Sequence, residues 1–303
     1  MAGHSGFLVV GGDSLVGKGL VGAFHASGHR VLATTRRRDT LNQARVYLDL
    51  EDESSFQVPP DIGYAYIVAA ATSYDRCESD SSARVMNVER IPSFAADLLK
   101  RGVFVAFIST NTVFGGDRSW PQEDDPYDAR IAYAEQKAEG ERAILQTAQR
   151  LGAQGRVAII RLTKVLHTTV SPLPAWLDTW REGRVVQPFA DLTFAPMSLG
   201  HVGAALARIG ELRVSGPLHV SGERNITYVD FAHALAQGLG VPKSLVQPTT
   251  ATEKGIVIPF KPHFSGLGMT RTTKLTGLAP QALAAVVDDL VASLGDWRGK
   301  ARA

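Results

Sequence analysis

The first half of the chain alternates short apolar runs with longer stretches whose apolar residues recur at helical spacing. Phe7–Val10 is a continuous apolar run that ends at two glycines. Continuous hydrophobicity of this kind is typical of a strand buried on both faces of a parallel sheet. The pattern predicts further strands at 30–35, 46–48, 64–71, 103–109 and 156–162, and helices at 14–27, 81–101 and 127–151. Such alternation predicts an α/β fold, a doubly wound parallel sheet of the Rossmann type.

The second half loses this regular alternation. After Thr163, prolines such as Pro172 and Pro188 interrupt the pattern, although helices are still predicted at 199–212 and 228–239 and a strand at 218–220. We therefore predict a nucleotide-binding Rossmann domain at residues 1–163. Residues 164–303 are predicted to be a smaller, mainly substrate-binding domain, with parts of about 191–220 returning to the sheet.

A glycine-rich turn follows the first predicted strand. In a doubly wound fold, a dinucleotide pyrophosphate meets the amino end of a helix at this point. Gly11 permits the tight turn, and Gly17 lets the helix pack closely. Ser14 replaces the middle glycine of the motif, and its hydroxyl is suited either to bond a phosphate or to cap the helix. A strand-to-helix turn without a ligand is the alternative interpretation. The residues expected to contact the cofactor are Gly11, Asp13, Ser14, Leu15, Val16 and Gly17.

The end of the second predicted strand bears on the choice of cofactor. NAD sites usually place an acidic residue there, whereas this chain has Arg36, Arg37 and Arg38. Guanidinium groups bind a 2′-phosphate through charge-assisted hydrogen bonds, which predicts NADP as the preferred cofactor and NAD as the alternative. A solvated basic turn would account for the same residues. Asp49 and Leu50 are expected either to bond the adenine amino group or to cap a turn.

A candidate proton-transfer pair lies on the predicted helix 127–151. Tyr133 and Lys137 are four residues apart and share one helix face. A free phenol has a pKa of about 10, and a nearby ammonium lowers that pKa toward neutrality. Tyr133 would then donate a proton to a carbonyl oxygen, while Lys137 also holds the cofactor ribose. Thr110 closes the fifth predicted strand, where its hydroxyl either bonds the same oxygen or caps a turn.

Composition excludes several classes of function. Lys and Arg number 32 against 30 Asp and Glu, so the net charge of +2 predicts no general attraction to nucleic acid or anionic membranes. The single cysteine, Cys77, cannot form an intrachain disulfide, and the histidines do not have metal-ligand spacing. The apolar runs are shorter than the roughly 18 residues of a membrane span. No basic segment precedes Phe7–Val10, so we expect a cytoplasmic protein without a signal peptide.

Several segments together resemble the extended short-chain dehydrogenase/reductase family across most of the chain. Residues 11–17 match its cofactor turn, 108–115 its Ser/Thr segment and 133–141 its Tyr-Lys helix. The resemblance implies an NAD(P)-dependent oxidoreductase in which Thr110, Tyr133 and Lys137 are catalytic. It also implies a structural role for a helix asparagine, Asn87, and a strand end beside the cofactor at Ala69, Ala70 and Ala71.

Within that family, the chain is most similar to the dTDP-4-dehydrorhamnose reductase-like sugar-nucleotide-binding proteins, through residues 71–78, 108–114 and 216–220. This implies NADPH-dependent reduction of a 4-keto group on a nucleotide-linked deoxysugar. Three positions depart from the related sequences: Asn111 replaces an aspartate, Thr112 a tyrosine and Lys164 a tryptophan. Because no Asp-Glu pair follows Thr110, the sugar-nucleotide 4,6-dehydratases are disfavoured.

The position of residues near the expected crevice suggests which of them contact the substrate. These are Thr72, Ser73, Thr110 and Lys164. Lys164 is expected either to meet a diphosphate or an acidic sugar, or simply to face solvent. Two other functions stay open: a sugar-nucleotide epimerase that regenerates its cofactor in place, and a non-catalytic dinucleotide-binding regulatory subunit. A homodimer is an expectation from the family alone.

Overall fold

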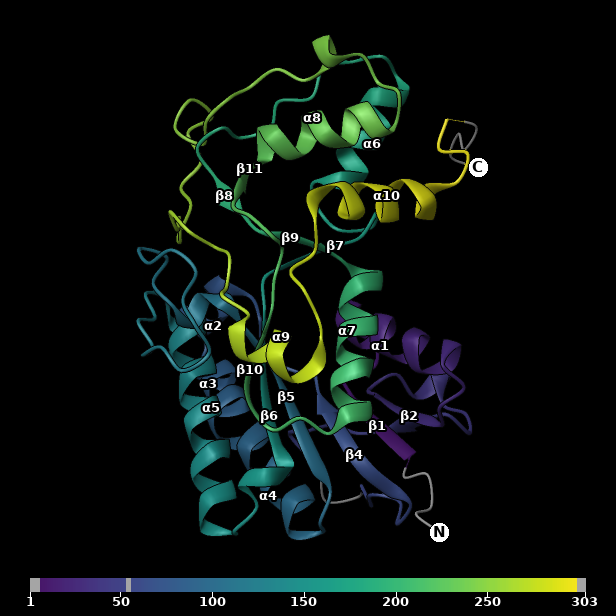
Figure 1. The fold of residues 1–303 in the computed structure, drawn as a ribbon, viewed down its shortest axis with the longest axis vertical. Coiled ribbons are helices and arrows are strands. Elements are labelled where there is room, and N and C mark those ends of the chain that lie inside the picture. Colours follow the sequence, from purple (N-terminus) through teal and green to yellow (C-terminus); the bar gives the residue numbers. More distant parts are fainter. Residues whose placement is uncertain (1–5, 53–55, 299–303) are drawn as a thin grey trace.

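A seven-stranded parallel sheet forms the base of the molecule (Figure 1). The computed structural model describes residues 6–52 and 56–298. The strand order β10-β6-β5-β4-β1-β2-β3 reverses direction between β1 and β4, which creates a crevice at the carboxyl ends of these strands. The strands are β1 (Gly6–Val10), β2 (Val31–Thr35), β3 (Arg45–Tyr47), β4 (Ile62–Ile67), β5 (Phe104–Thr110), β6 (Val157–Leu162) and β10 (Gly216–Val220).

Helices cover both faces of the sheet. On one side are α1 (Leu15–Ala26), α7 (Leu199–Leu212) and α9 (Thr270–Thr276); on the other are α3 (Ser81–Arg84), α4 (Ile91–Lys100) and α5 (Ala132–Arg150). Successive residues of a strand face opposite sides, so Phe7 and Val9 join the core beneath α1 and α7, whereas Leu8 and Val10 join the core beneath α4 and α5. This double burial is why β1 reads as an uninterrupted apolar run.

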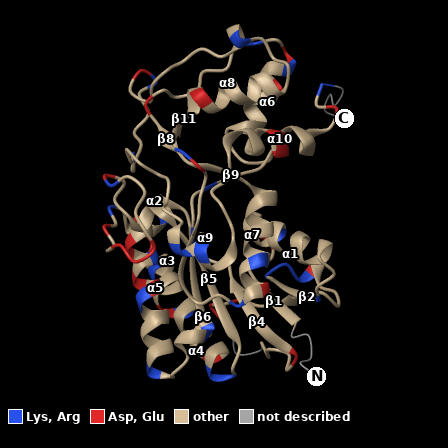
Figure 2. Cartoon of the chain, viewed as in Figure 1, with Lys and Arg blue, Asp and Glu red and all other residues tan. Residues whose placement is uncertain are grey.

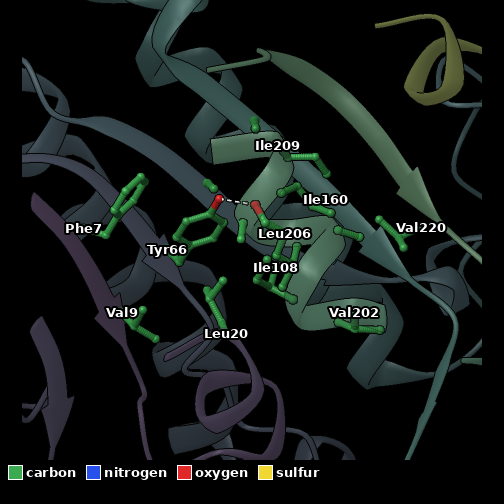
Figure 3. Close-up of a cluster of buried hydrophobic side chains, with 14 of the residues drawn as sticks. Phe7, Val9, Leu20, Tyr66, Ile108, Ile160, Val202, Leu206, Ile209 and Val220 are labelled. Atoms are coloured by element: carbon green, nitrogen blue, oxygen red, sulfur yellow. Dashed lines mark hydrogen bonds between the residues drawn. The ribbon is translucent and has the colours of Figure 1, made fainter. Parts of the chain in front are cut away.

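The core beneath α7 shows how late elements return to the sheet. Figure 3 shows Tyr66 of β4 within this core, and its phenol donates a hydrogen bond of 2.5 Å to the carbonyl of Leu206 in α7. Helix α7 also lies close to α1, because a Cβ on Gly203 would come within 2.6 Å of the Gly19 carbonyl. Strand β10 then pairs with β6. The later helix α9 also contacts β10, beyond the segment that we predicted to return.

A smaller unit lies beyond the carboxyl ends of the strands (Figure 1). Its apolar core includes the rings of Trp176, Trp180 and Phe231. Its helices are α6 (Leu173–Arg181), α8 (Tyr228–Gly238) and α10 (Leu283–Leu294), and its short strands are β7 (Lys164–Leu166), β8 (Thr193–Phe194), β9 (Pro196–Ser198) and β11 (Ile226–Thr227). Because β6 runs through Thr163 directly into β7, this unit sits over the mouth of the crevice. Figure 2 shows charged residues of both signs scattered along the helices and loops.

Two helices differ from the sequence prediction. The helix expected at 127–151 begins only at Ala132, since the chain from Tyr127 to Ile131, behind Pro126, has no regular secondary structure. The helix expected at 81–101 contains a π-helical turn, Val85–Arg90, between α3 and α4. Single π-helical turns are often found at functional sites, and this one carries Asn87. A short helix that the pattern did not predict, α2 (Tyr74–Ser79), follows β4.

Candidate active site

A cavity of about 640 Å³ opens at the carboxyl ends of β1, β2 and β4. Its volume lies within the range usual for cofactor sites. Of the residues predicted to contact the cofactor, the cavity is lined by Gly11, Asp13, Ser14, Arg36, Arg37, Asp49, Leu50, Ala69, Ala70 and Ala71. Leu15, Val16 and Gly17 belong to the first turn of α1 and are not among its lining residues, although Gly17 shapes the turn.

The glycine turn is built for close approach of backbone. Gly11 has a φ of +91°, and a Cβ there would come within 2.7 Å of the Ala69 amide nitrogen, just after the end of the neighbouring strand β4. A Cβ on Gly17 would come within 2.4 Å of the Gly11 carbonyl, so this glycine lets α1 start directly on the turn. The Ser14 hydroxyl accepts the Gly17 amide at 3.0 Å and caps the helix. A pyrophosphate therefore fits this turn, facing the amino end of α1.

The arginines after β2 do not all have the same environment. Arg37 donates to the Asp13 carboxylate at 3.0 Å, and Arg45 donates to the same group. The Thr35 hydroxyl adds a hydrogen bond of 2.5 Å; although burial raises the pKa of Asp13, these donors together hold it below its usual value. Arg36 lines the cavity and has no ion-pair partner within the described part of the chain.

Asp49 fulfils the capping alternative, because its carboxylate accepts the Glu51 amide at 3.1 Å. It also lines the cavity beside Leu50, so the cap holds this edge of the cavity in place. Arg38, the third arginine, lies over the ring of Tyr47 at 3.9 Å and does not line the cavity.

Thr110 and Tyr133 come together at the carboxyl end of β5. Burial raises the pKa of Tyr133, the neighbouring Tyr74 raises it further, and a hydrogen bond with Thr110 opposes both effects. The rings of Tyr74 and Tyr133 lie 5.5 Å apart. The sequence did not single out Tyr74; the signal available was its place on the segment that follows β4 toward the crevice.

Lys137 does not act on the phenol in this structure. Its ammonium donates to the Ile108 carbonyl at 2.8 Å and lies 3.8 Å from the centre of the Phe107 ring. Burial lowers the pKa of Lys137 to about 7, against the opposing attraction of Glu141. The expectation that Lys137 lowers the pKa of Tyr133 is therefore wrong for this arrangement, because the lysine is directed at β5 and the phenol pKa is raised.

Asn87 ties the cofactor cavity to the helix that carries Tyr133. Its side-chain oxygen accepts the Ala71 amide at 3.0 Å, and its side-chain nitrogen donates to the Ala71 carbonyl at 2.9 Å. The same nitrogen donates to Gln136, next to Lys137, at 2.9 Å. Gly140 allows this contact, since a Cβ there would come within 2.8 Å of the Asn87 carbonyl.

The predicted substrate residues are separated by the structure. Thr72 lines the cavity, whereas Ser73 caps α2 by accepting the Arg76 amide at 3.4 Å. Lys164 is exposed on β7 and has no ion-pair partner among residues 6–52 and 56–298. Thr112, which the sequence showed only as a departure from its relatives, is buried against Thr110, with 3.1 Å between their hydroxyl oxygens.

A second polar cluster supports the same helix. Arg161 of β6 is 2% exposed and pairs with the fully buried Glu141 of α5 at 2.8 Å. Tyr127 donates to Glu141 at 2.9 Å, and Arg161 also lies 3.2 Å from His219 of β10. The cluster joins α5 to β6 and β10.

Among residues 6–52 and 56–298, none of the helices has both the length and the apolar composition that a membrane span requires.

Comparisons with known proteins agree with this architecture. Residues 6–295 match the model of the RmlD substrate binding domain family. A probable dTDP-4,6-dihydroxy-2-methyloxan-3-one 4-ketoreductase from Streptomyces antibioticus is 28% identical over 239 residues, covering 77% of this chain and 74% of that protein. Methionine adenosyltransferase 2 subunit beta from Rattus norvegicus is 26% identical over 265 residues, covering 80% and 75%.

A solved structure shares the fold. The dTDP-4-dehydrorhamnose reductase from Bacillus anthracis, determined in complex with NADP, superposes with a TM-score of 0.79 at 16% identity, covering 97% of this chain and 99% of that one. The predicted fold class and family resemblance are confirmed. The chain therefore belongs to the RmlD substrate binding domain family and is an NAD(P)-dependent oxidoreductase of the extended short-chain dehydrogenase/reductase type.

Proposed function

We propose that the protein reduces the 4-keto group of a nucleotide-linked deoxysugar with NADPH. One observation carries the proposal: Tyr133 packs against Ala71, which lines a cavity suited to a dinucleotide, and Thr110 closes the strand β5 beside them. A relative named for 4-keto reduction of a dTDP-linked sugar supports this substrate class.

The hydroxyl groups of Tyr133 and Thr110 determine the roles that we assign to these side chains. Tyr133 acts as the general acid that donates its proton to the carbonyl oxygen, and Thr110 polarises that oxygen with a hydrogen bond. A nicotinamide cofactor, when bound, supplies the hydride. The raised pKa of Tyr133 keeps the phenol protonated before reduction. Lys137 is assigned to the cofactor ribose and to the packing of α5 on β5, where it already contacts Ile108.

The preference for NADP rests on Arg36. Its guanidinium is the one in the 36–38 run that both lines the cavity and lacks an ion-pair partner within the described ranges. A 2′-phosphate is the cofactor group that such a cation would recognise, and NAD remains the weaker alternative. Asp49 and Leu50 would meet the adenine, Thr72 the sugar, and Lys164 a phosphate or an acidic group of the substrate.

Replacing Tyr133 tests the reaction directly. Tyr133→Phe keeps the ring against Tyr74 but removes the proton, so turnover of a dTDP-4-keto-6-deoxysugar should fall about 100-fold or more. NADPH affinity, measured by fluorescence titration, should change less than about twofold. Tyr47→Phe is the matched control, since Tyr47 packs under Arg38 away from Thr110. A Tyr133→Phe protein that still reduces the sugar at the parent rate excludes the mechanism.

A second candidate follows from the similarity to methionine adenosyltransferase 2 subunit beta: a dinucleotide-binding subunit of another enzyme. The presence of Thr110, Tyr133 and Lys137 favours the reductase. The two functions separate in one assay. A reductase consumes one NADPH per sugar reduced, an epimerase converts the sugar with no net consumption, and a binding subunit converts no sugar but co-purifies with a stoichiometric partner.

A further inference from the structure

The hydroxyl of Thr110 is contacted by both the backbone amide and the hydroxyl of Thr112. The Thr112 amide lies 3.2 Å from the Thr110 hydroxyl oxygen, and the two hydroxyl oxygens are 3.1 Å apart. Both side chains are buried, with 9% of Thr110 and 7% of Thr112 exposed. The side chain on which the proposed reaction depends is thus contacted twice by one neighbour.

The number of protons on each hydroxyl limits how these contacts are made. A threonine hydroxyl has one proton to donate and two lone pairs that accept. The Thr112 amide fills one lone pair of Thr110, because an amide can only donate. In the described residues, the Thr112 hydroxyl has Thr110 as its one hydrogen-bond partner. When Thr112 donates its proton to Thr110, both lone pairs are filled and Thr110 must use its own proton elsewhere.

Two groups near Thr110 can accept that proton: the phenol oxygen of Tyr133, through the hydrogen bond described above, and the side-chain oxygen of Asn111. The side-chain nitrogen of Asn111 donates to the Ser265 carbonyl at 2.9 Å, which turns its side-chain oxygen toward Thr110. That oxygen lies 3.4 Å from the Thr110 hydroxyl, a long and weak contact. A substrate carbonyl at normal distance would replace it as the acceptor, and more so as negative charge develops on the carbonyl oxygen.

We propose that Thr112 is a positioning residue that fixes Thr110 as a hydrogen-bond donor to the substrate carbonyl. The proposal rests on the proposed reductase function. Without the Thr112 hydroxyl, the O–H bond of Thr110 is free to rotate toward the position that the Thr112 hydroxyl had occupied. The Thr110 hydroxyl also loses the hydrogen bond from Thr112 that makes it a stronger donor. Linked hydroxyls polarise one another, so the loss is felt at the substrate although Thr112 does not touch it.

A purely structural role for Thr112 makes a different prediction. Thr110 caps the short turn Asn111–Val113 by accepting the Thr112 amide. This cap uses the backbone N–H of residue 112 and survives any substitution there except proline. Thr112→Val therefore removes the hydroxyl at nearly constant shape, and Thr112→Ser restores the hydroxyl without the methyl group.

Steady-state kinetics of the full chain separate the two roles. For Thr112→Val we expect kcat to fall about tenfold, equivalent to about 1.4 kcal/mol, with KM for the sugar and the Kd for NADPH within twofold of the parent. Thr112→Ser should keep kcat within about twofold. An unchanged kcat in Thr112→Val overturns the proposal, and so does a loss in Thr112→Ser as large as that in Thr112→Val.

Neutron diffraction from deuterated crystals shows which of the two hydroxyl groups donates to the other, and it requires no catalytic turnover. The deuterium of Thr112 is expected on the line to the Thr110 oxygen, with the deuterium of Thr110 directed away from Thr112. A deuterium of Thr110 directed at Thr112 would overturn the proposal. If the parent reduces no 4-keto sugar, the proposed function fails, while the neutron result still accepts or rejects the donor arrangement.

Discussion

The ammonium of Lys137 lies in an apolar layer, between the Phe107 ring and the Ile108 carbonyl, with 2% of the residue exposed. Burial lowers its pKa from 10.5 to about 7. Between these two values, the unfolded chain binds a proton that the folded chain does not. The free energy of unfolding therefore gains a contribution that rises with pH across this window.

Lys137→Met should remove that contribution. We expect the free energy of unfolding of the parent to rise relative to the variant by about 2 kcal/mol between pH 7 and pH 9, measured by urea denaturation at each pH. Lys100→Met is the matched control, because Lys100 is exposed on α4 beside Asp97. A difference between parent and Lys137→Met that does not vary with pH would contradict the burial argument.

The two arginines of the 36–38 run that line the cavity should differ in their effect on cofactor choice. Arg37 is already engaged by Asp13, whereas Arg36 is not. Arg36→Ala should weaken NADPH binding about tenfold or more and leave NADH binding unchanged, since a charge-assisted hydrogen bond contributes roughly 1.5–3 kcal/mol. Arg37→Ala should cost less. Fluorescence titration with both cofactors measures the ratio, with Arg38→Ala as control; equal losses for both cofactors in Arg36→Ala would remove the 2′-phosphate assignment.

At the scale of elements, helix α5 is fastened to the sheet by a buried charge pair. Glu141 accepts hydrogen bonds from Arg161, Tyr127 and Ser109, and it is fully buried. Removing one partner of such a pair leaves an uncompensated buried charge, which typically costs about 3–5 kcal/mol. The same helix carries a surface pair, Glu139 with Arg84, in which both side chains are at least a third exposed.

Glu141→Gln should therefore lower the free energy of unfolding by about 3 kcal/mol, as measured by chemical denaturation. Glu139→Gln, on the same helix, should cost about 1 kcal/mol or less, because water screens an exposed pair. If the two substitutions prove equally mild, the buried pair does not anchor the helix.

The elements that the sequence predicted well are those with a strong periodic signal. The strands around Phe7–Val10 and at 103–109 lie fully inside the sheet, and the helix at 199–212 begins and ends as predicted. Those that it missed are short or lie among prolines. Strand β7 has three residues, and α6 starts at Leu173 with a proline in its first turn, so neither offers enough residues for a period to appear.

For the candidate site, the sequence predicted the positions of residues along the chain but not the directions of their side chains. The glycine turn and the Thr110, Tyr133 and Lys137 set follow from spacing, since strand ends and helix faces fix where such residues lie. The direction of a long side chain does not follow from spacing. Lys137 reaches β5 and Arg37 reaches Asp13 because of tertiary partners that sequence patterns do not show.

At the scale of the whole molecule, the nucleotide-binding half is not complete at residue 163. Strand β10 supplies the seventh strand by pairing along β6, with Leu218 opposite Ile160. Helix α7 covers the sheet face that β1 and β4 present to it, with Val202, Leu206 and Ile209 buried in that core. A sheet face needs such a covering layer to be stable in water.

A fragment of residues 1–163 should therefore fail to fold as a unit. Without α7 and β10, the apolar face around Tyr66 is exposed to water and one edge of the sheet loses its partner. We expect the fragment to aggregate, or to bind a hydrophobic dye and to unfold without a cooperative transition, whereas the full chain unfolds cooperatively. Co-expression with residues 164–303 provides the comparison, because the missing strand and helix are then supplied in trans. A monomeric fragment with a sharp thermal transition would show that the first 163 residues bury enough surface by themselves, and that the later elements add the substrate side without completing the core.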